Sequence, residues 1–188
     1  KINDNSAWSA ALRYFSLGNI TFTDETGANL GTYNPNEYTF DFGYGMKFNT
    51  NLSGGLAMRY IYSNLTGGQN VGEYETEPGT AFAVDLSAYY ESDLLEKNQW
   101  ALGVNISNIG TKISYTANEE KDFLPMNLKL GGRYSMNIDD FNKFSVAFDV
   151  NKLLVPTPPV YAENVQDSII AGQDPDVSVI QAIFQSFG

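Results

Sequence analysis

Seven segments of this 188-residue chain alternate between apolar and other side chains with a period of two. They are predicted strands at Ala7–Leu17, Tyr38–Phe48, Leu52–Leu65, Thr80–Glu91, Gln99–Ile109, Met126–Ile138 and Lys143–Leu153. These strands are long, because strands in ordinary globular domains run about five or six residues. At about 3.3 Å per residue and a tilt of about 40°, ten or eleven residues cross an apolar band of about 25 Å. The strand lengths therefore favour a sheet that spans a membrane.

The connections between these strands alternate in length. Asn49–Asn51, Ser92–Asn98 and Asp139–Asn142 are short turns, whereas the intervening connections are long and polar. The long ones are Gly18–Glu37, Thr66–Gly79, Gly110–Pro125 and the segment after Leu154. Short turns on one side and long loops on the other are the layout of outer-membrane barrels.

In every predicted strand, one phase of the alternation runs to the strand end without interruption by a charged residue. It includes Trp8, Leu12, Tyr38, Phe40, Phe42, Leu56, Met58, Phe82, Leu86, Leu102, Val104, Leu128, Leu130, Phe144, Val146, Phe148 and Val150. An Arg or Lys at the middle of a lipid-facing strand costs about 2–4 kcal/mol. An uninterrupted apolar phase is therefore what lipid requires, although the buried face of a soluble sheet has the same pattern.

The opposite phase combines small residues with charges of both signs. The charged members are Arg13, Asp41, Lys47, Arg59, Asp85, Lys129, Arg133 and Asp149, and Gly, Ala and Ser surround them. This mixture is typical of a crowded, polar barrel interior. We expect the charges to form ion pairs that hold the barrel together, in preference to lining a substrate path.

The predicted fold class is therefore all-β, an antiparallel transmembrane β-barrel with a short helix in a long extracellular loop. Aromatic residues at the strand ends, such as Trp8, Trp100 and Tyr38, suit the two interfacial girdles of such a barrel. Open sheet edges are not tolerated in lipid, so we expect about fourteen strands in the full protein, with seven in this chain. Residues 1–154 are predicted to hold these strands, and residues 155–188 a long extracellular loop. A soluble β-sandwich or lipocalin-like barrel is the less favoured alternative.

The segment after Leu154 is predicted to contain an amphipathic helix at about residues 175–187. Asp174-Pro175-Asp176 favours a helix start, with Asp174 as the cap, and Gly188 could close the helix. Its apolar residues follow at helical spacing: Val177, Ile180, Ile183, Phe184 and Phe187. Such a helix either forms a lid over its own barrel or docks on a partner. In the second case these five residues, together with Phe123 of another loop, are candidate partner-binding residues.

The composition argues against catalysis. The chain has no Cys and no His, which removes serine-type triads and the usual zinc ligands. A formal net charge of −11 argues against a nucleic-acid partner. We expect no catalytic, cofactor-binding or metal-binding residues, and we do not expect an enzyme.

Three segments resemble the PorV family of outer-membrane proteins of type IX secretion systems, part of the wider FadL-like group of fourteen-stranded barrels. They are Trp8–Phe15, Leu124–Gly132 and Asp149–Pro156, and the resemblance extends over essentially the whole chain. It implies a location in the bacterial outer membrane, in contact with lipid and lipopolysaccharide. It also implies an adaptor role, in which the protein binds a large translocon barrel (SprA- or Sov-like). Secreted cargo would be received through its C-terminal signal domain and passed to a sortase-type attachment complex (PorU-like).

Two other functions remain open at this point. Other FadL-like barrels transport hydrophobic small molecules, which requires an apolar pocket that opens to one side. The small and charged inner phase offers little apolar lining, which favours the adaptor. A soluble β-sheet binding domain is the weaker alternative.

Overall fold

The structure is a computed structural model, and it describes residues 3–67, 76–95, 97–116, 121–162 and 168–188. Within these ranges the chain is mostly antiparallel β-sheet with one short helix, which confirms the all-β part of the prediction. No described helix has the length and apolar character needed to cross a membrane.

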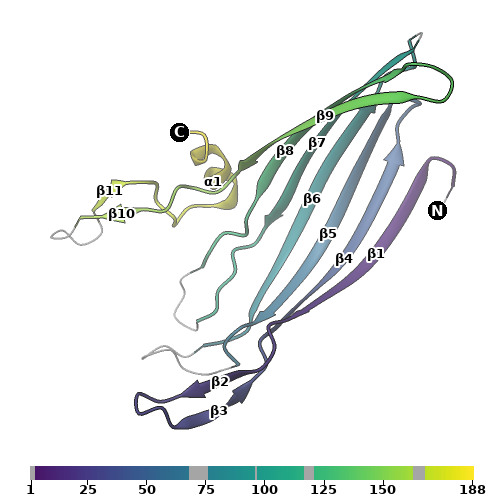
Figure 1. Cartoon of the computed structure of the whole chain (residues 1–188). Helices are drawn as coiled ribbons and strands as arrows, with labels where there is room; N and C mark the ends of the chain where they lie inside the picture. The colour runs from purple at the N-terminus through teal and green to yellow at the C-terminus, as the bar shows by residue number, and fades with distance from the viewer. Residues whose placement is uncertain (1–2, 68–75, 96, 117–120, 163–167) are drawn as a thin grey trace.

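Seven long strands form one curved sheet in which each strand pairs antiparallel with its neighbours (Figure 1). In sheet order they are β1 (Ser6–Ser16), β4 (Asn36–Lys47), β5 (Leu52–Asn64), β6 (Gly79–Glu91), β7 (Asn98–Gly110), β8 (Asn127–Asn137) and β9 (Lys143–Leu153). Every predicted strand is present, and its ends differ from the prediction by at most two residues. Within the described ranges the sheet is open, with β1 and β9 as its edges.

The register places the two sequence phases on opposite faces of the sheet. Tyr44 pairs with Leu56, Leu56 with Leu86, and Leu86 with Ile106, so these side chains lie in one row across four strands. We call this side the apolar face. Most of its large side chains are exposed, which is unusual because soluble monomers rarely show apolar patches above about 300–600 Å². The other side, which carries the ion pairs, is called the charged face.

Aromatic rings on the apolar face contact one another near both ends of the strands. Near the long loops, Tyr38 stacks on Tyr62 with ring centroids 4.7 Å apart, and Tyr60 lies 5.1 Å from Phe82. Near the short turns, the ring centroids of Tyr90 and Trp100 are 5.0 Å apart. The rings therefore occupy the positions at which interfacial girdles are expected.

Two short hairpins occur where the sequence analysis predicted only loops. They are β2 (Ile20–Thr23) with β3 (Asn29–Tyr33), and β10 (Val160–Tyr161) with β11 (Ile169–Ala171). In the turn between β2 and β3, the Asp24 carboxylate accepts from the backbone N–H groups of Thr26 and Ala28 at 2.8 and 2.9 Å. Gly27 in the same turn has a φ of 83°, which suits glycine.

The predicted helix is shorter than expected and begins later. Helix α1 (Val179–Gln185) is capped by Ser178, whose hydroxyl accepts from the Gln181 N–H, so the prediction of Asp174 as the cap was wrong. The Asp174 carboxylate instead accepts from the Asp176 N–H at 2.8 Å and closes a local turn. The helix ends at Gln185 with Ser186 as its C-cap, so Gly188 does not provide the predicted stop.

Candidate functional site

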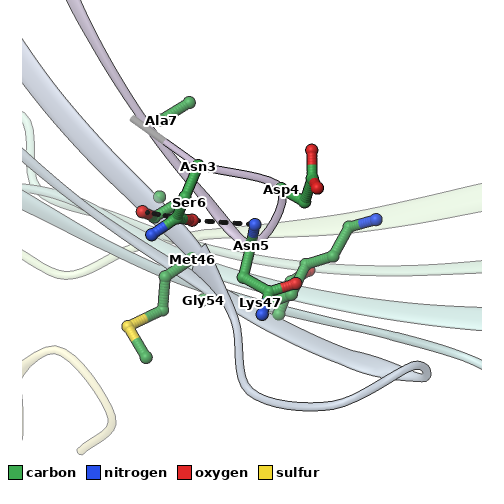
Figure 2. Close-up of a pocket in the computed structure, with 10 residues that line it drawn as sticks. Asn3, Asp4, Asn5, Ser6, Ala7, Met46, Lys47 and Gly54 are labelled. Atoms are coloured by element: carbon green, nitrogen blue, oxygen red, sulfur yellow. Dashed lines mark hydrogen bonds between the residues drawn. The ribbon is translucent and has the colours of Figure 1, made fainter. Parts of the chain in front are cut away.

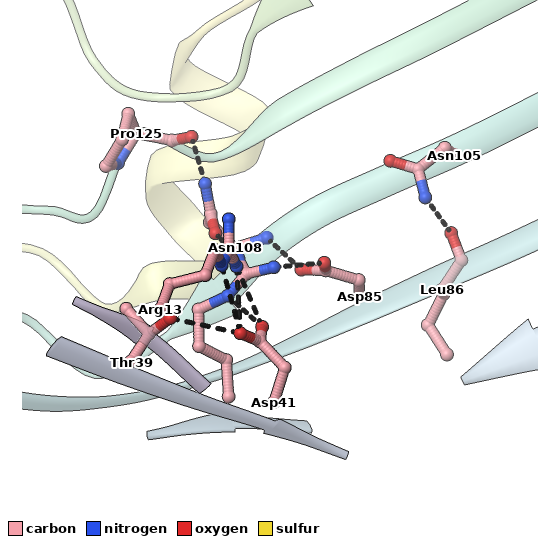
Figure 3. Close-up of polar contacts among 9 residues, drawn as sticks. Arg13, Thr39, Asp41, Asp85, Leu86, Asn105, Asn108 and Pro125 are labelled. Atoms are coloured by element: carbon pink, nitrogen blue, oxygen red, sulfur yellow. Dashed lines mark hydrogen bonds and ion pairs between the residues drawn. The ribbon is translucent and has the colours of Figure 1, made fainter. Parts of the chain in front are cut away.

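A network of charged side chains crosses the charged face near the loop end of the sheet (Figure 3). Arg59 on β5 occupies its centre, with its Nε 2.6 Å from Asp41 Oδ1 and its Nη2 3.1 Å from Asp85 Oδ2. Arg13 on β1 approaches Asp41 from the other side, at 2.9 Å. The side chains of Arg59, Asp41 and Asp85 are only 19%, 15% and 18% exposed. Four of the eight predicted interior charges therefore meet in one linked cluster.

A β-bulge in β7 extends this network to the next connection. Asn108 has a φ of 60°, and the register between β6 and β7 shifts beside it. Its backbone N–H donates to Asp85 Oδ1 at 2.7 Å, and its side-chain carbonyl accepts from Arg59. Asn108 Nδ2 donates to the carbonyl of Pro125 at 3.1 Å. Asn tolerates this left-handed conformation better than most residues.

The other predicted interior charges lie outside this cluster. Lys129 and Asp149 form a separate pair at 3.2 Å with both side chains about half exposed. Arg133 pairs at 2.7 Å with Glu91, which was not among the predicted interior charges, and also donates to the Tyr89 hydroxyl. Among the described residues, the structure records no ion pair for Lys47. It lines an open hollow beside the N-terminal turn at residues 3–5, next to Met46 (Figure 2).

Helix α1 lies against the apolar face at the loop ends of β7 to β9. Ala182 is completely buried in a cluster with Met126 and Leu154, and Ile106 and Leu128 of the apolar face pack against the same cluster. The helix therefore does not cover the charged face, as a lid over the barrel interior would. Three of the six candidate partner-binding residues, Val177, Ile183 and Phe123, also pack into this cluster.

The other three candidate residues point away from the cluster. Ile180, Phe184 and Phe187 are 69%, 74% and 62% exposed. Lys152, at the loop end of β9, anchors this end of the helix, because its Nζ donates to the Ser186 carbonyl at 2.6 Å and lies 4.9 Å from the centre of the Phe187 ring. The helix thus keeps an apolar surface free while it is fixed to the sheet.

Sequence reasoning missed Glu91, Asn108 and Lys152. Glu91 and Lys152 lie at strand ends, where alternation gives little guidance. Asn108 is displaced from the strict alternation by the bulge, and an Asn-Ile-Gly string at a strand end is only a weak signal for one. Among the described residues, no group of acidic side chains could hold a metal ion.

The family model described as type IX secretion system protein PorV matches residues 1–160. The chain belongs to the PorV family. No curated protein matches the chain.

Membership in the PorV family identifies the chain as a type IX secretion system component. The matched range includes all seven long strands and the charge network, but α1 lies beyond it. PorV is a family of secretion-system components and not a family of enzymes. The charge network and the exposed side chains of the α1 segment are therefore considered as structural and interaction surfaces.

Proposed function

We propose that the chain forms part of the wall of an outer-membrane β-barrel that acts as an adaptor in type IX secretion. The observation that carries the membrane part is the apolar face, which extends over seven strands with large exposed side chains. Along β9, the apolar face carries no charged residue before Lys152, which lies at the loop end of the strand. The two edges, β1 and β9, would pair with further strands, because unpaired backbone groups are costly in lipid. About fourteen strands in all would close such a barrel.

The adaptor would bind a large translocon barrel and the C-terminal signal domains of secreted cargo. It would then deliver the cargo to a sortase-type attachment complex. Membership in the PorV family supports a role in this secretion route. The exposed side chains of Ile180, Phe184 and Phe187 form the surface we assign to partner docking. Aromatic anchors on a rigid support are typical of interface hot spots.

The docking surface predicts a specific loss of partners. Phe184→Glu in the full-length protein places a charge at the centre of the proposed contact, and should weaken partner binding by about 2 kcal/mol or more, roughly thirtyfold in Kd. The measurement is affinity purification from detergent-extracted outer membranes, followed by mass spectrometry of the bound proteins. The wild type should recover a very large barrel, a sortase-type component or exported proteins that share a C-terminal domain.

Gln181→Glu is the matched control, because it adds the same charge to an exposed position of the same helix. It should leave the recovered partners unchanged. Equal recovery with wild type and Phe184→Glu would refute docking through α1. Recovery of the wild type alone, or with only bound lipid or fatty acid, would instead favour a transporter of hydrophobic small molecules.

A further inference from the structure

At the loop end of β6, the charged face is covered by described parts of the connection between β7 and β8. Ile113 and Leu124 of this connection pack on Ala81 and Ala83 of β6, and both alanines are almost completely buried. Tyr115 packs against the same cluster. Residues 111–116 and 121–126, the described parts of this connection, are called the plug below.

Backbone hydrogen bonds hold the plug in a defined shape. Ile113 and Asp122 exchange two N–H to carbonyl bonds, each of 2.8 Å. The Glu77 N–H donates to the Tyr115 carbonyl at 3.0 Å, which ties the plug to the chain just before β6. The Tyr115 hydroxyl donates to Ser63 Oγ at 3.1 Å. The Ser63 hydroxyl in turn donates to the Glu37 carboxylate at 2.6 Å. The plug is therefore bonded directly to β5 and to the chain just before β6, and through Ser63 to β4.

The wall beneath the plug is shaped to receive it. Gly79, Ala81 and Ala83 follow one another on the charged face of β6, so this part of the strand has almost no side-chain bulk. A Cβ atom added at Gly79 would lie 2.8 Å from Ile113 Cγ1 and 2.9 Å from Tyr115 Cε1. Real side chains do not approach so closely, so a larger residue at Gly79 must displace the Ile113 and Tyr115 side chains of the plug.

The charge network fixes the other end of the plug. Asn108 donates from its side chain to the Pro125 carbonyl, while Arg59 donates to the Asn108 side-chain oxygen. Asp85 bonds both Arg59 and the Asn108 backbone, so the wall and the plug share one set of polar contacts. Asn108 is thus placed to act as a positioning residue for the plug.

We propose that the plug seals the loop end of the charged face against solutes, and that Asn108 latches it to the wall through Arg59. The seal would make the interior of the barrel a closed compartment on the loop side. This inference rests on the barrel in the proposed function, but not on any partner. The charge network would then hold the plug in place in addition to stabilising the sheet.

Ion conductance of the full-length protein in planar lipid bilayers tests the seal. The wild type should conduct poorly. Asn108→Gly removes both side-chain contacts and still permits the positive φ, and Gly79→Val pushes on Ile113 and Tyr115, so each should raise conductance several-fold. Asn108→Asp keeps the oxygen that Arg59 binds but loses donation to Pro125, and should fall between the wild type and Asn108→Gly.

Ala147→Phe is the matched control for added bulk, since Ala147 lies on the charged face of β9 away from the plug. It should not raise conductance. A second readout uses the absence of Cys from these 188 residues: the thiol of Ala81→Cys should resist an impermeant maleimide, and should react once Asn108→Gly is added.

The seal would be overturned if Asn108→Gly and Gly79→Val, inserted in lipid as folded barrels, had the conductance of the wild type and if Asn108→Gly left the labelling of Ala81→Cys unchanged. High conductance of the wild type would overturn it too. Failure of the protein to insert in lipid would refute the barrel itself. Recovery of no partner proteins with the wild type, while its conductance stays low, would refute only the adaptor role. The two proposals therefore fail in distinguishable ways.

Discussion

Arg59 is the residue on which the charged face most depends. Its guanidinium separates two carboxylates, Asp41 and Asp85, that are both largely shielded from water. Removal of one partner from such a cluster leaves the others desolvated and unpaired, which costs more than the cluster contributes as a whole. The sequence alone predicted that these charges face one side and form ion pairs, but not which of them pair, because strand register decides which neighbours face each other.

Arg59→Met should therefore lower the free energy of unfolding by about 1–3 kcal/mol. The measurement is denaturant unfolding of the full-length barrel in detergent micelles or lipid. Lys129→Met is the control, because the Lys129–Asp149 pair is about half exposed and such pairs contribute about 0–1 kcal/mol. Equal effects of the two substitutions would show that the cluster has no special role.

Asp139 provides a pH-dependent prediction in a turn outside the proposed membrane-spanning segments. Hydrogen bonds from Asn142, and then from the Phe141 N–H, hold the pKa of its carboxyl below the usual value. Because the folded pKa is lowered, this stabilisation is present above the unfolded pKa and is lost as pH falls through the folded pKa. Asn142→Ala should raise the pKa of Asp139, as measured by an NMR titration of its carboxyl carbon. An unchanged pKa would contradict this cause.

At the scale of the element, two adjacent residues of β9 should differ greatly in the cost of the same added charge. Phe148 is on the apolar face near the middle of the strand, and Ala147 is on the charged face. Phe148→Arg should destabilise the barrel in lipid by about 2–4 kcal/mol, whereas Ala147→Arg should have a much smaller effect. Refolding into lipid vesicles over a denaturant series measures both. A similar cost for both would argue against a lipid-facing strand.

The long strands were predictable because alternation over ten or more residues is a strong local signal. The short hairpins were not, since β10 and β11 have only two and three residues. Helix α1 was found from its apolar spacing, but its start was misplaced because Asp174 and Ser178 both suit an N-cap. In the structure Ser178 is the cap, and Ala182 in the first turns of the helix packs beside Met126 and Leu154.

At the scale of the molecule, the two faces of the sheet have different covers at the loop end. Ile113, Tyr115 and Leu124 of the plug pack on the charged face, whereas α1 packs on the apolar face, where Phe123 and Met126 join its cluster. Sequence reasoning gave a lid formed by the helix as one alternative, whereas in the structure a different connection packs on the charged face. Only long-range contacts decide whether the helix or the β7–β8 connection packs on the charged face, and no local sequence pattern predicts such contacts.

The central claim is that the apolar face contacts lipid, and spin-label accessibility along β5 tests it most directly. Single cysteines from Gly55 to Tyr60 in the full-length protein would be spin-labelled and reconstituted in lipid bilayers. Labels at 56, 58 and 60 should collide mainly with oxygen, which concentrates in the bilayer. Labels at 55, 57 and 59 should be poorly accessible to oxygen. Absence of this alternation, with every label reached equally by a water-soluble relaxation agent, would contradict the membrane barrel.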